Sequence, residues 1–569
     1  MSIPLSGKRI HPIRVAWEMG RWIMSNRSYS QVVLDATEEY IEHLKSLPTN
    51  QLPSPRDAAS ELMSRTVDEI ELENSVKVRS QKFPVPRNLS LVQVAMLVPV
   101  YFKVVRISCA GESTDESRDL LGVYQTDEPN MGLYATDDAT LRRTIRLFRF
   151  DITKRDFEEV QVHLRDLAPR MSRCVNPDYI PVNNGIFDYR SKQFHAFSPD
   201  VVLLSKCRIN YNPNAWNVLI HNDTDGTDWD VVSWMNSLSD DPQVVLLLWQ
   251  IVGAIIRPFV SWDKFILLYS ESGSNGKGTL CELLRQLCGE GTYASIPLSD
   301  MGKDFMLEPL THATAVIVDE NDVGTYIDKA AILKAIVTHD VIQINRKYMN
   351  PIAYRFFGLV VQCINELPRI KDKSDSFYRR MLMVPMPKCF TGHERKYIKQ
   401  EYLHRPDVLE YVLKLVLESN YDTFTVPKAC LDLQAEYKEY NDPLRQFTAE
   451  ILPLCRWHLL PFTFLYDLYK AWLRINQPSG APVGRNTFIK ELIKIACDNP
   501  EWICLDKSRK IPTQIKSHGI HLMPGPEPLI GEYNLTGWIN GANQQALYCP
   551  KLNDGYRGLV RRSFVKYLT

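Results

Sequence analysis

Residues 265–279 read FILLYSESGSNGKGT, an apolar run followed by a glycine-bearing loop with a lysine near its end. The apolar run predicts a fully buried strand, and residues 280–287 have the spacing of an amphipathic helix. A strand, a glycine-bearing loop with lysine and a helix, in this order, are typical of a phosphate-binding loop, because backbone N–H groups and the helix dipole then point at an anion. The stretch therefore predicts a P-loop, and a purely structural glycine turn is the alternative.

The loop supplies the candidate ligands for ATP. Lys277 would bridge the β- and γ-phosphates, and a hydroxyl group would hold Mg²⁺. Two positions depart from the general pattern: Glu271 stands where the first glycine is usual, and Gly278 where Ser or Thr holds the metal. Thr279 is the substitute metal ligand, which leaves the register of the loop open. The residues expected to bind the nucleotide are Gly273, Ser274, Asn275, Gly276, Lys277, Gly278 and Thr279.

Two further apolar runs predict strands that deliver polar side chains to one edge of a sheet. Residues 315–318 end in Asp319 and Glu320, and residues 359–364 end in Asn365. The carboxyl ends of parallel strands form the ligand-binding edge of an α/β sheet. We therefore expect Asp319 to hold Mg²⁺, Glu320 to polarise the attacking water and Asn365 to bind the γ-phosphate. A solvated strand end and an ordinary turn are the alternatives.

Arg379 and Arg380 precede the apolar residues 381–384. A guanidinium group that reaches the γ-phosphate of a neighbouring subunit would stabilise charge in the transition state. A surface arginine pair is the alternative for these two residues.

Residues 342–357 predict a hairpin with Arg346, Lys347 and Tyr348 near its tip. Two cations and an aromatic ring suit single-stranded nucleic acid, since the cations bind phosphates and the ring stacks on a base. A solvated charged turn is the alternative.

Together these motifs resemble superfamily III helicases, and more closely the phage and plasmid primase–helicase family related to the poxvirus primase–helicase. The resemblance covers roughly residues 140–515. Within it, residues 184–199 look like part of the family's domain ahead of the motor, and residues 442–495 resemble its C-terminal winged helix. Residues 332–348 look like the family's motif before the DNA-binding hairpin, with His339 where glycine is usual.

The resemblance implies an α/β P-loop NTPase motor of the AAA+-like kind that forms a homo-oligomeric ring, expected to be a hexamer. Such a ring hydrolyses ATP at subunit interfaces and pulls single-stranded DNA past its hairpins, with 3′-to-5′ polarity. The expected function is an ATP-dependent DNA helicase that acts at replication forks of a phage, plasmid or other mobile element, with a primase or polymerase as a possible partner. The roles carried over belong to Lys277, Thr279, Asp319, Glu320, Asn365, Arg380 or Arg379, and Lys347.

Two other functions stay open. In the first, the chain is a DNA-binding initiator or assembly protein, in which nucleotide locks an oligomer without processive unwinding. In the second, it is an ATPase that acts on protein.

With 569 residues, the chain is too long for one ordinary domain. Its 67 basic and 67 acidic residues balance, so any contact with nucleic acid must be local. We expect five parts, namely a helical N-terminal region of unknown function (1–140), the family domain preceding the motor (141–260), the helicase ATPase core (261–390), a helical linker with a winged-helix domain (391–515), and a linker with a basic tail (516–569).

The remaining composition indicates a cytoplasmic protein, expected in a bacterial host. The 12 cysteines include no Cys-x-x-Cys pair, which predicts reduced buried thiols rather than zinc ligands. Gln250 interrupts the longest apolar run, and that run is shorter than the roughly 18–20 residues that a membrane span needs. Residues 1–140 contain no strand-borne pair of aspartates for two-metal nucleotidyl transfer. We therefore expect a scaffold or partner-binding element there, which robust de novo priming would contradict.

Overall fold

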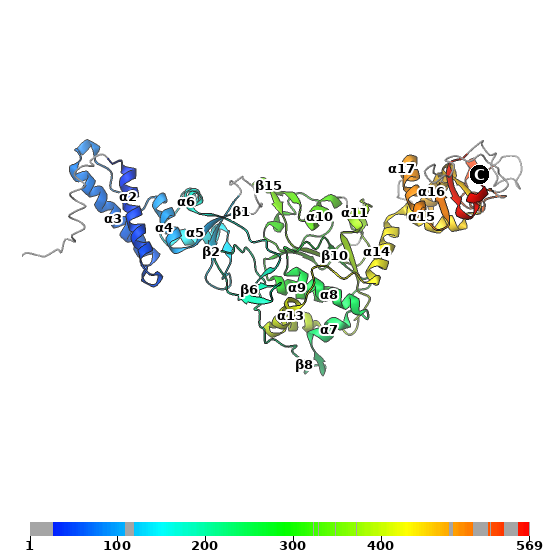
Figure 1. Ribbon diagram of the computed structural model, residues 1–569, viewed down its shortest axis with the longest axis horizontal. Coiled ribbons are helices and arrows are strands. Elements are labelled where there is room, and N and C mark those ends of the chain that lie inside the picture. The colour runs from blue at the N-terminus through cyan, green and yellow to red at the C-terminus, as the bar shows by residue number, and fades with distance from the viewer. Residues whose placement is uncertain are drawn as a thin grey trace, which may run out of the picture.

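The computed structural model describes residues 27–108, 119–322, 324–327, 329–347, 349–370, 372–476, 482–504, 522–523, 525–539 and 556–567. Figure 1 shows N-terminal helices, a central α/β body and a C-terminal domain that follow one another along the long axis. None of the helices in these described ranges is long and apolar enough to cross a membrane.

Three α-helices lie between Tyr29 and Tyr101. Each helix begins after a serine whose hydroxyl accepts a hydrogen bond from the backbone N–H three residues on, which favours initiation there. In the core, Gln93 Nε2 donates to the hydroxyls of Thr37 and Thr66 at 3.0 and 2.9 Å and so joins the three helices. These helices are α2 (Tyr29–Ser46), α3 (Pro55–Val76) and α4 (Leu91–Tyr101).

Residues 104–108 and 119–135 differ from the helical structure expected for residues 1–140. They form three strands of a sheet ordered β3-β2-β1-β4, in which β1 pairs in parallel with the distant β4. A pairing between such distant segments leaves no local periodicity, which is why the sequence did not reveal this sheet. The elements are β1 (Val104–Ser108), β2 (Leu120–Tyr124), β3 (Tyr134–Ala135), α5 (Asp138–Arg146), α6 (Lys154–Leu167) and β4 (Arg170–Ser172).

Two small antiparallel sheets and two helices lead into the central body. Residues 184–199, which resemble part of the family's domain ahead of the motor, contain a hairpin in which β6 and β7 pair antiparallel. The elements are β5 (Tyr179–Val182), β6 (Gly185–Asp188), β7 (Gln193–His195), β8 (Ile220–Asn222), β9 (Thr227–Trp229), α7 (Val231–Ser237) and α8 (Pro242–Ile255).

The central sheet has five parallel strands in the order β11-β12-β16-β10-β18. β16, which ends before Asn365, lies between two other strands. One is β10, which leads into the glycine-bearing loop, and the other is β12, which ends before Asp319 and Glu320. This arrangement confirms the predicted α/β class. The strands are β10 (Phe265–Tyr269), β11 (Tyr293–Ala294), β12 (Ala315–Val318), β16 (Leu359–Ile364) and β18 (Met381–Pro385).

Helices cover both faces of this sheet. Alternate residues of β10 point to opposite faces: Ile266 and Leu268 join one buried cluster, Phe265 and Leu267 the other. The first cluster includes α8, α9 (Lys277–Cys288) and α13 (Pro406–Glu418), and the second includes α10 (Ala330–Val337) and α14 (Lys428–Asn441). Residues 406–441, expected within a helical linker, therefore complete the core of the central body.

Short elements surround the sheet. The hairpin predicted over residues 342–357 is confirmed by the antiparallel pairing of β14 with β15. These elements are η4 (Glu308–Thr311), β13 (Tyr326–Ile327), β14 (Val341–Arg346), β15 (Met349–Arg355), β17 (Arg369–Ile370), α11 (Asp375–Tyr378) and α12 (Lys396–Gln400).

The C-terminal domain encloses its own core, in which Trp457, Trp472 and Trp502 are fully buried. Its antiparallel sheet has the order β19-β21-β20, with β21 in the centre. The elements are α15 (Pro443–Ile451), β19 (Leu459–Pro461), α16 (Phe462–Asn476), α17 (Arg485–Asp498), β20 (Trp502–Cys504), α19 (Pro528–Glu532) and β21 (Gly558–Arg561).

The linker and basic tail expected for residues 516–569 need correction. β21 is the central strand of the sheet, and Leu522 and Ile530 are buried in the same core. Arg562 donates from Nε and Nη2 to the Asn499 carbonyl at 3.1 and 3.0 Å, which caps the end of α17. Glycine and proline around these residues hid the signal, because a lone strand that pairs across the chain has no periodicity of its own.

Candidate functional site

The loop between β10 and α9 is built from backbone conformations that favour glycine. Gly276, the residue before the first turn of α9, has φ 87°, and Ser274 has φ 54°. A Cβ added at Gly276 would lie 2.7 Å from Leu238 Cδ2, whereas one added at Gly273 would meet nothing within 4 Å. Asn275 is buried and donates from Nδ2 to the Ser272 carbonyl, which closes the loop. The loop therefore presents the amino end of α9 to a ligand.

Lys277 lies at this amino end and is 5% exposed. Its Nζ donates to Asn365 Oδ1 at 2.9 Å and to the Ser270 carbonyl at 3.4 Å. Burial lowers the pKa of Lys277. Both acceptors are neutral oxygens, so a negatively charged ligand would compete well for this ammonium group.

Asp319 and Glu320 follow β12 at the same carboxyl edge, and both are exposed. Arg285, two turns along α9 from Lys277, contacts both carboxylate oxygens of Asp319, with Nη2–Oδ1 2.9 Å and Nη1–Oδ2 3.3 Å. The hydrogen bond from Arg285 holds the pKa of Asp319 below its ordinary value. Sequence reasoning missed Arg285, although its helical spacing from Lys277 was a usable signal.

A buried polar network fixes the turn that carries these acids. Asn321 donates from Nδ2 to Gln362 Oε1 and to the Cys363 carbonyl, both at 3.0 Å, and accepts from Leu298 N at 2.9 Å. Gln362 is fully buried and donates to the Ile296 carbonyl at 3.0 Å. The network joins the turn that carries Asp319 and Glu320 to β16, and therefore to Asn365. In the sequence, the signal for this network was Gln362, a polar residue within an apolar run.

The segment after β18 folds over the loop. Phe390 N donates to the Ser274 carbonyl at 2.7 Å, and Ser274 Oγ donates to Glu394 Oε1 at 2.8 Å. The segment continues into α12, where Lys399 Nζ lies 3.5 Å from the position of a Cβ added at Gly278. No local pattern in residues 389–399 indicated this contact, because it depends on the turn at the end of β18.

Arg379 and Arg380 lie at the opposite edge of the sheet. The Arg379 carbonyl accepts from Lys264 Nζ and the Arg380 carbonyl from Phe265 N, so both residues precede β18 beside the start of β10. The length of β10 separates them from Lys277 by roughly 16 Å. Arg380 Nη1 donates to the Ser376 carbonyl and hydroxyl, both at 2.7 Å, whereas the Arg379 side chain is exposed.

Arg346 and Lys347 lie where β14 ends, and Tyr348 lies outside the described residues. Ile344, which pairs with Ile352 in the middle of the hairpin, is fully buried and anchors it. His339, where the family resemblance led us to expect glycine, has φ 54°, and its Nδ1 lies 2.9 Å from the Phe356 carbonyl. The left-handed backbone explains why glycine suits this position.

The donor set fits a nucleotide polyphosphate with Mg²⁺. The loop N–H groups and Lys277 are suited to phosphate oxygens, and the Asp319 carboxylate and Thr279 hydroxyl could hold the metal. No cluster of three His, Cys, Asp or Glu side chains in the described part of the chain is arranged as a metal site. A P-loop site does not need one, since phosphates and water complete the shell of Mg²⁺.

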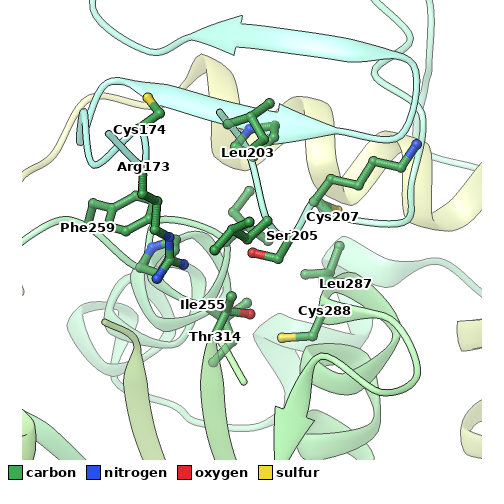
Figure 2. A pocket seen from close by; sticks show the side chains of 15 residues that line it. Arg173, Cys174, Leu203, Ser205, Cys207, Ile255, Phe259, Leu287, Cys288 and Thr314 are labelled. Atoms are coloured by element: carbon green, nitrogen blue, oxygen red, sulfur yellow. The ribbon is translucent and has the colours of Figure 1, made fainter. Parts of the chain in front are cut away.

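Figure 2 shows a cavity that is lined by other segments of the chain. Leu203, Ser205, Ile255, Cys288 and Thr314 are among its lining residues. Cys288 ends α9 and Thr314 precedes β12, so the cavity lies toward the amino edge of the sheet. None of the residues expected to bind nucleotide lines it.

Three family models match separate segments of the chain. Residues 154–237 match "D5 N terminal like", residues 268–380 match a family of unknown function (DUF5906), and residues 439–517 match "Poxvirus D5 protein-like". The second segment contains Lys277, Asp319, Glu320 and Asn365. No curated protein matches the sequence.

Solved structures also resemble the chain. An apo structure of the NrS-1 C-terminal region has 14% identity and a TM-score of 0.38, and covers 73% of this chain and 87% of that chain. Another has 12% identity and a TM-score of 0.37, with 72% and 83% coverage. A JCV helicase with a bound small molecule has 17% identity and a TM-score of 0.23, with 38% and 63% coverage.

Two glycines of the loop provide a matched pair for mutation. Gly276→Ala should lower the free energy of unfolding by about 1–2 kcal/mol or more, since an alanine there is left-handed and meets Leu238. Gly278→Ala should leave stability unchanged or raise it by up to about 1 kcal/mol, because it lies in α9 with room for a methyl group. Chemical denaturation measures both, and equal losses would contradict this account of the loop.

The pair between Arg285 and Asp319 predicts a pH dependence. Because the folded-state pKa of Asp319 is lowered, the pair stabilises the fold above about pH 4 and loses this effect as pH falls through the folded-state pKa. Arg285→Met should therefore lower the thermal midpoint at neutral pH, and the difference from wild type should shrink toward pH 3. Thermal midpoints of Asp319→Asn and of the double variant, measured over the same pH range, complete a double-mutant cycle that gives the interaction energy between the two side chains. A difference that ignores pH would contradict it.

Proposed function

Because the chain belongs to the D5-like primase–helicase family, we propose that it is an ATP-dependent DNA helicase of superfamily III that serves a phage, plasmid or other mobile element. The observation that carries the proposal is the meeting of three distant segments at one sheet edge. Lys277 Nζ contacts Asn365 Oδ1 at 2.9 Å, and the acids after β12 lie at the same edge, on the far side of β16. A structural glycine turn requires none of these partners.

The chemistry follows from what each side chain can do. The loop N–H groups and Lys277 bind the β- and γ-phosphates of ATP. An anion draws Lys277 from Asn365, since a bond between two charged groups is stronger than one to an amide. The Asn365 amide is then released to bind the γ-phosphate and the lytic water, which Glu320 polarises. Asp319 and Thr279 would hold Mg²⁺, which would supply positive charge to the phosphates.

The position of the arginines favours a ring. Arg379 lies a strand's length from Lys277 of its own chain, so it can reach a γ-phosphate only in a neighbouring subunit. Arg380 already donates to Ser376, which makes Arg379 the better candidate for that role. We propose a homo-oligomer, with six subunits as in the family that the sequence resembles.

Two surfaces are proposed to contact DNA. Arg346 and Lys347 stand at the hairpin tip, where they suit phosphates of a single strand. The described part of the C-terminal domain runs helix, strand, helix, helix, strand, helix, strand, which is the order of a winged helix with the short helix α19 added before the last strand. Its α17 buries Phe488, Leu492 and Ala496 and exposes Arg485, Lys490 and Lys494. The exposed side of α17 suits duplex DNA.

A second function has an observation of its own. Gly278 supplies no hydroxyl to a metal, and Arg285 occupies the Asp319 carboxylate. A site of this kind suits a DNA-binding initiator in which nucleotide locks an assembly without processive unwinding.

Glu320→Gln distinguishes the two functions. The variant should keep its affinity for ATP, because Glu320 is not part of the phosphate-binding loop. Its rate of unwinding a forked duplex should fall by at least about a hundredfold, because the attacking water is no longer polarised. Nucleotide binding is measured by titration and unwinding by release of a labelled strand. Wild-type protein that never unwinds, or a variant that unwinds as well as wild type, would favour the initiator.

Mixed subunits test the role of Arg379. Lys277→Ala and Arg379→Ala should each reduce hydrolysis by roughly 10³-fold or more. Mixing the two variants should restore part of the activity, since some interfaces then pair an intact loop with an intact arginine. Arg380→Ala serves as the neighbouring control and should act mainly through stability. If mixing restores no ATP hydrolysis, or if Arg379→Ala hydrolyses ATP normally, then Arg379 does not act at the ATP site of a neighbouring subunit.

A further inference from the structure

Lys399 is a cation beside the phosphate loop. Its side chain is half-buried, and no carboxylate in the described part of the chain forms an ion pair with it. Its Nζ lies 3.5 Å from the point where a side chain at position 278 would begin. Position 278 is where a P-loop normally carries the hydroxyl that holds the metal. The ammonium group therefore lies next to the missing hydroxyl.

Positive charge is concentrated at this end of α9. Lys277 begins this helix and Lys399 Nζ lies beside Gly278, so both lysines and the amino end of the helix dipole lie near its first turn. Asp319 is close enough for Lys399 to lower its pKa, but Arg285 takes both carboxylate oxygens. An anionic ligand at this first turn would therefore be attracted by both lysines.

Contacts on two sides hold Lys399 in place. Tyr397, in the same short helix, donates its hydroxyl to Asp225 Oδ2 at 2.6 Å, and Ile398 is buried in the core that includes α9. Upstream, Phe390 and Glu394 are hydrogen-bonded to Ser274 of the loop. A lysine on a surface helix would not need this support, whereas a ligand-binding group gains from it because less freedom is lost on binding.

We propose that Lys399 binds the phosphates of the nucleotide and supplies, at the first turn of α9, positive charge that a bound metal otherwise provides. The ligand is a nucleoside di- or triphosphate, and its binding, unlike its hydrolysis, requires little Mg²⁺. This inference rests on the proposed nucleotide site and adds one residue to it.

Binding of ADP to the full-length chain tests the proposal, measured by calorimetry in EDTA and again in excess Mg²⁺. Wild type should bind with similar affinity in both. Lys399→Met should weaken binding about tenfold or more in EDTA and less in Mg²⁺, since it removes one charge-assisted contact. Lys399→Arg should retain most of the affinity. Lys396→Met, an exposed lysine of the same helix, is the matched control and should bind like wild type.

The outcomes are distinguishable. If Lys399→Met binds ADP as well as Lys396→Met does, or if EDTA abolishes binding by wild type, the role of Lys399 is overturned and the nucleotide site stands. If wild type binds no nucleotide under either condition, the proposed function fails together with this inference. Thermal unfolding of each variant separates loss of binding from loss of folding.

Discussion

The hydrogen bond from Lys277 Nζ to Asn365 Oδ1, 2.9 Å long, is the contact on which the account of this protein depends. It can form only if β16 lies directly beside β10 in parallel, so that both strands end at the same edge. The same order places the acids of β12 on the far side of β16. Because Gln362 and Asn321 fasten β12 to β16 inside the core, the three strand ends keep their spacing as one unit.

The features that could be predicted from the sequence are local. The buried strand before the loop, the acids after a β-branched run and Asn365 after another are each visible within a few residues. What could not be predicted depends on distant pairing. β1 joins β4, β21 enters the C-terminal sheet from beyond a segment rich in glycine and proline, and the turn after β18 brings Lys399 to α9.

The two edges of the central sheet have different chemistry. The carboxyl edge gathers Lys277, Asn365 and the acid pair, and the amino edge carries Arg379 with its side chain in solvent. One chain alone cannot bring these edges together, whereas neighbouring copies in a ring can. Gly278, which lacks the usual hydroxyl, and Asp319, which is paired with Arg285, lie at the carboxyl edge, where Arg285 and Lys399 add positive charge. The proposed motor therefore has a phosphate site with more fixed cations than its loop alone would supply.

ATP hydrolysis by the purified chain, with and without single-stranded DNA, tests the central claim most directly. The account predicts hydrolysis that DNA stimulates strongly and that Lys277→Ala abolishes. Hydrolysis that ignores DNA would contradict a DNA-coupled motor and favour an ATPase that acts on protein. No hydrolysis under any condition would contradict the catalytic role of the strand ends and leave a nucleotide-locked assembly protein as the better account.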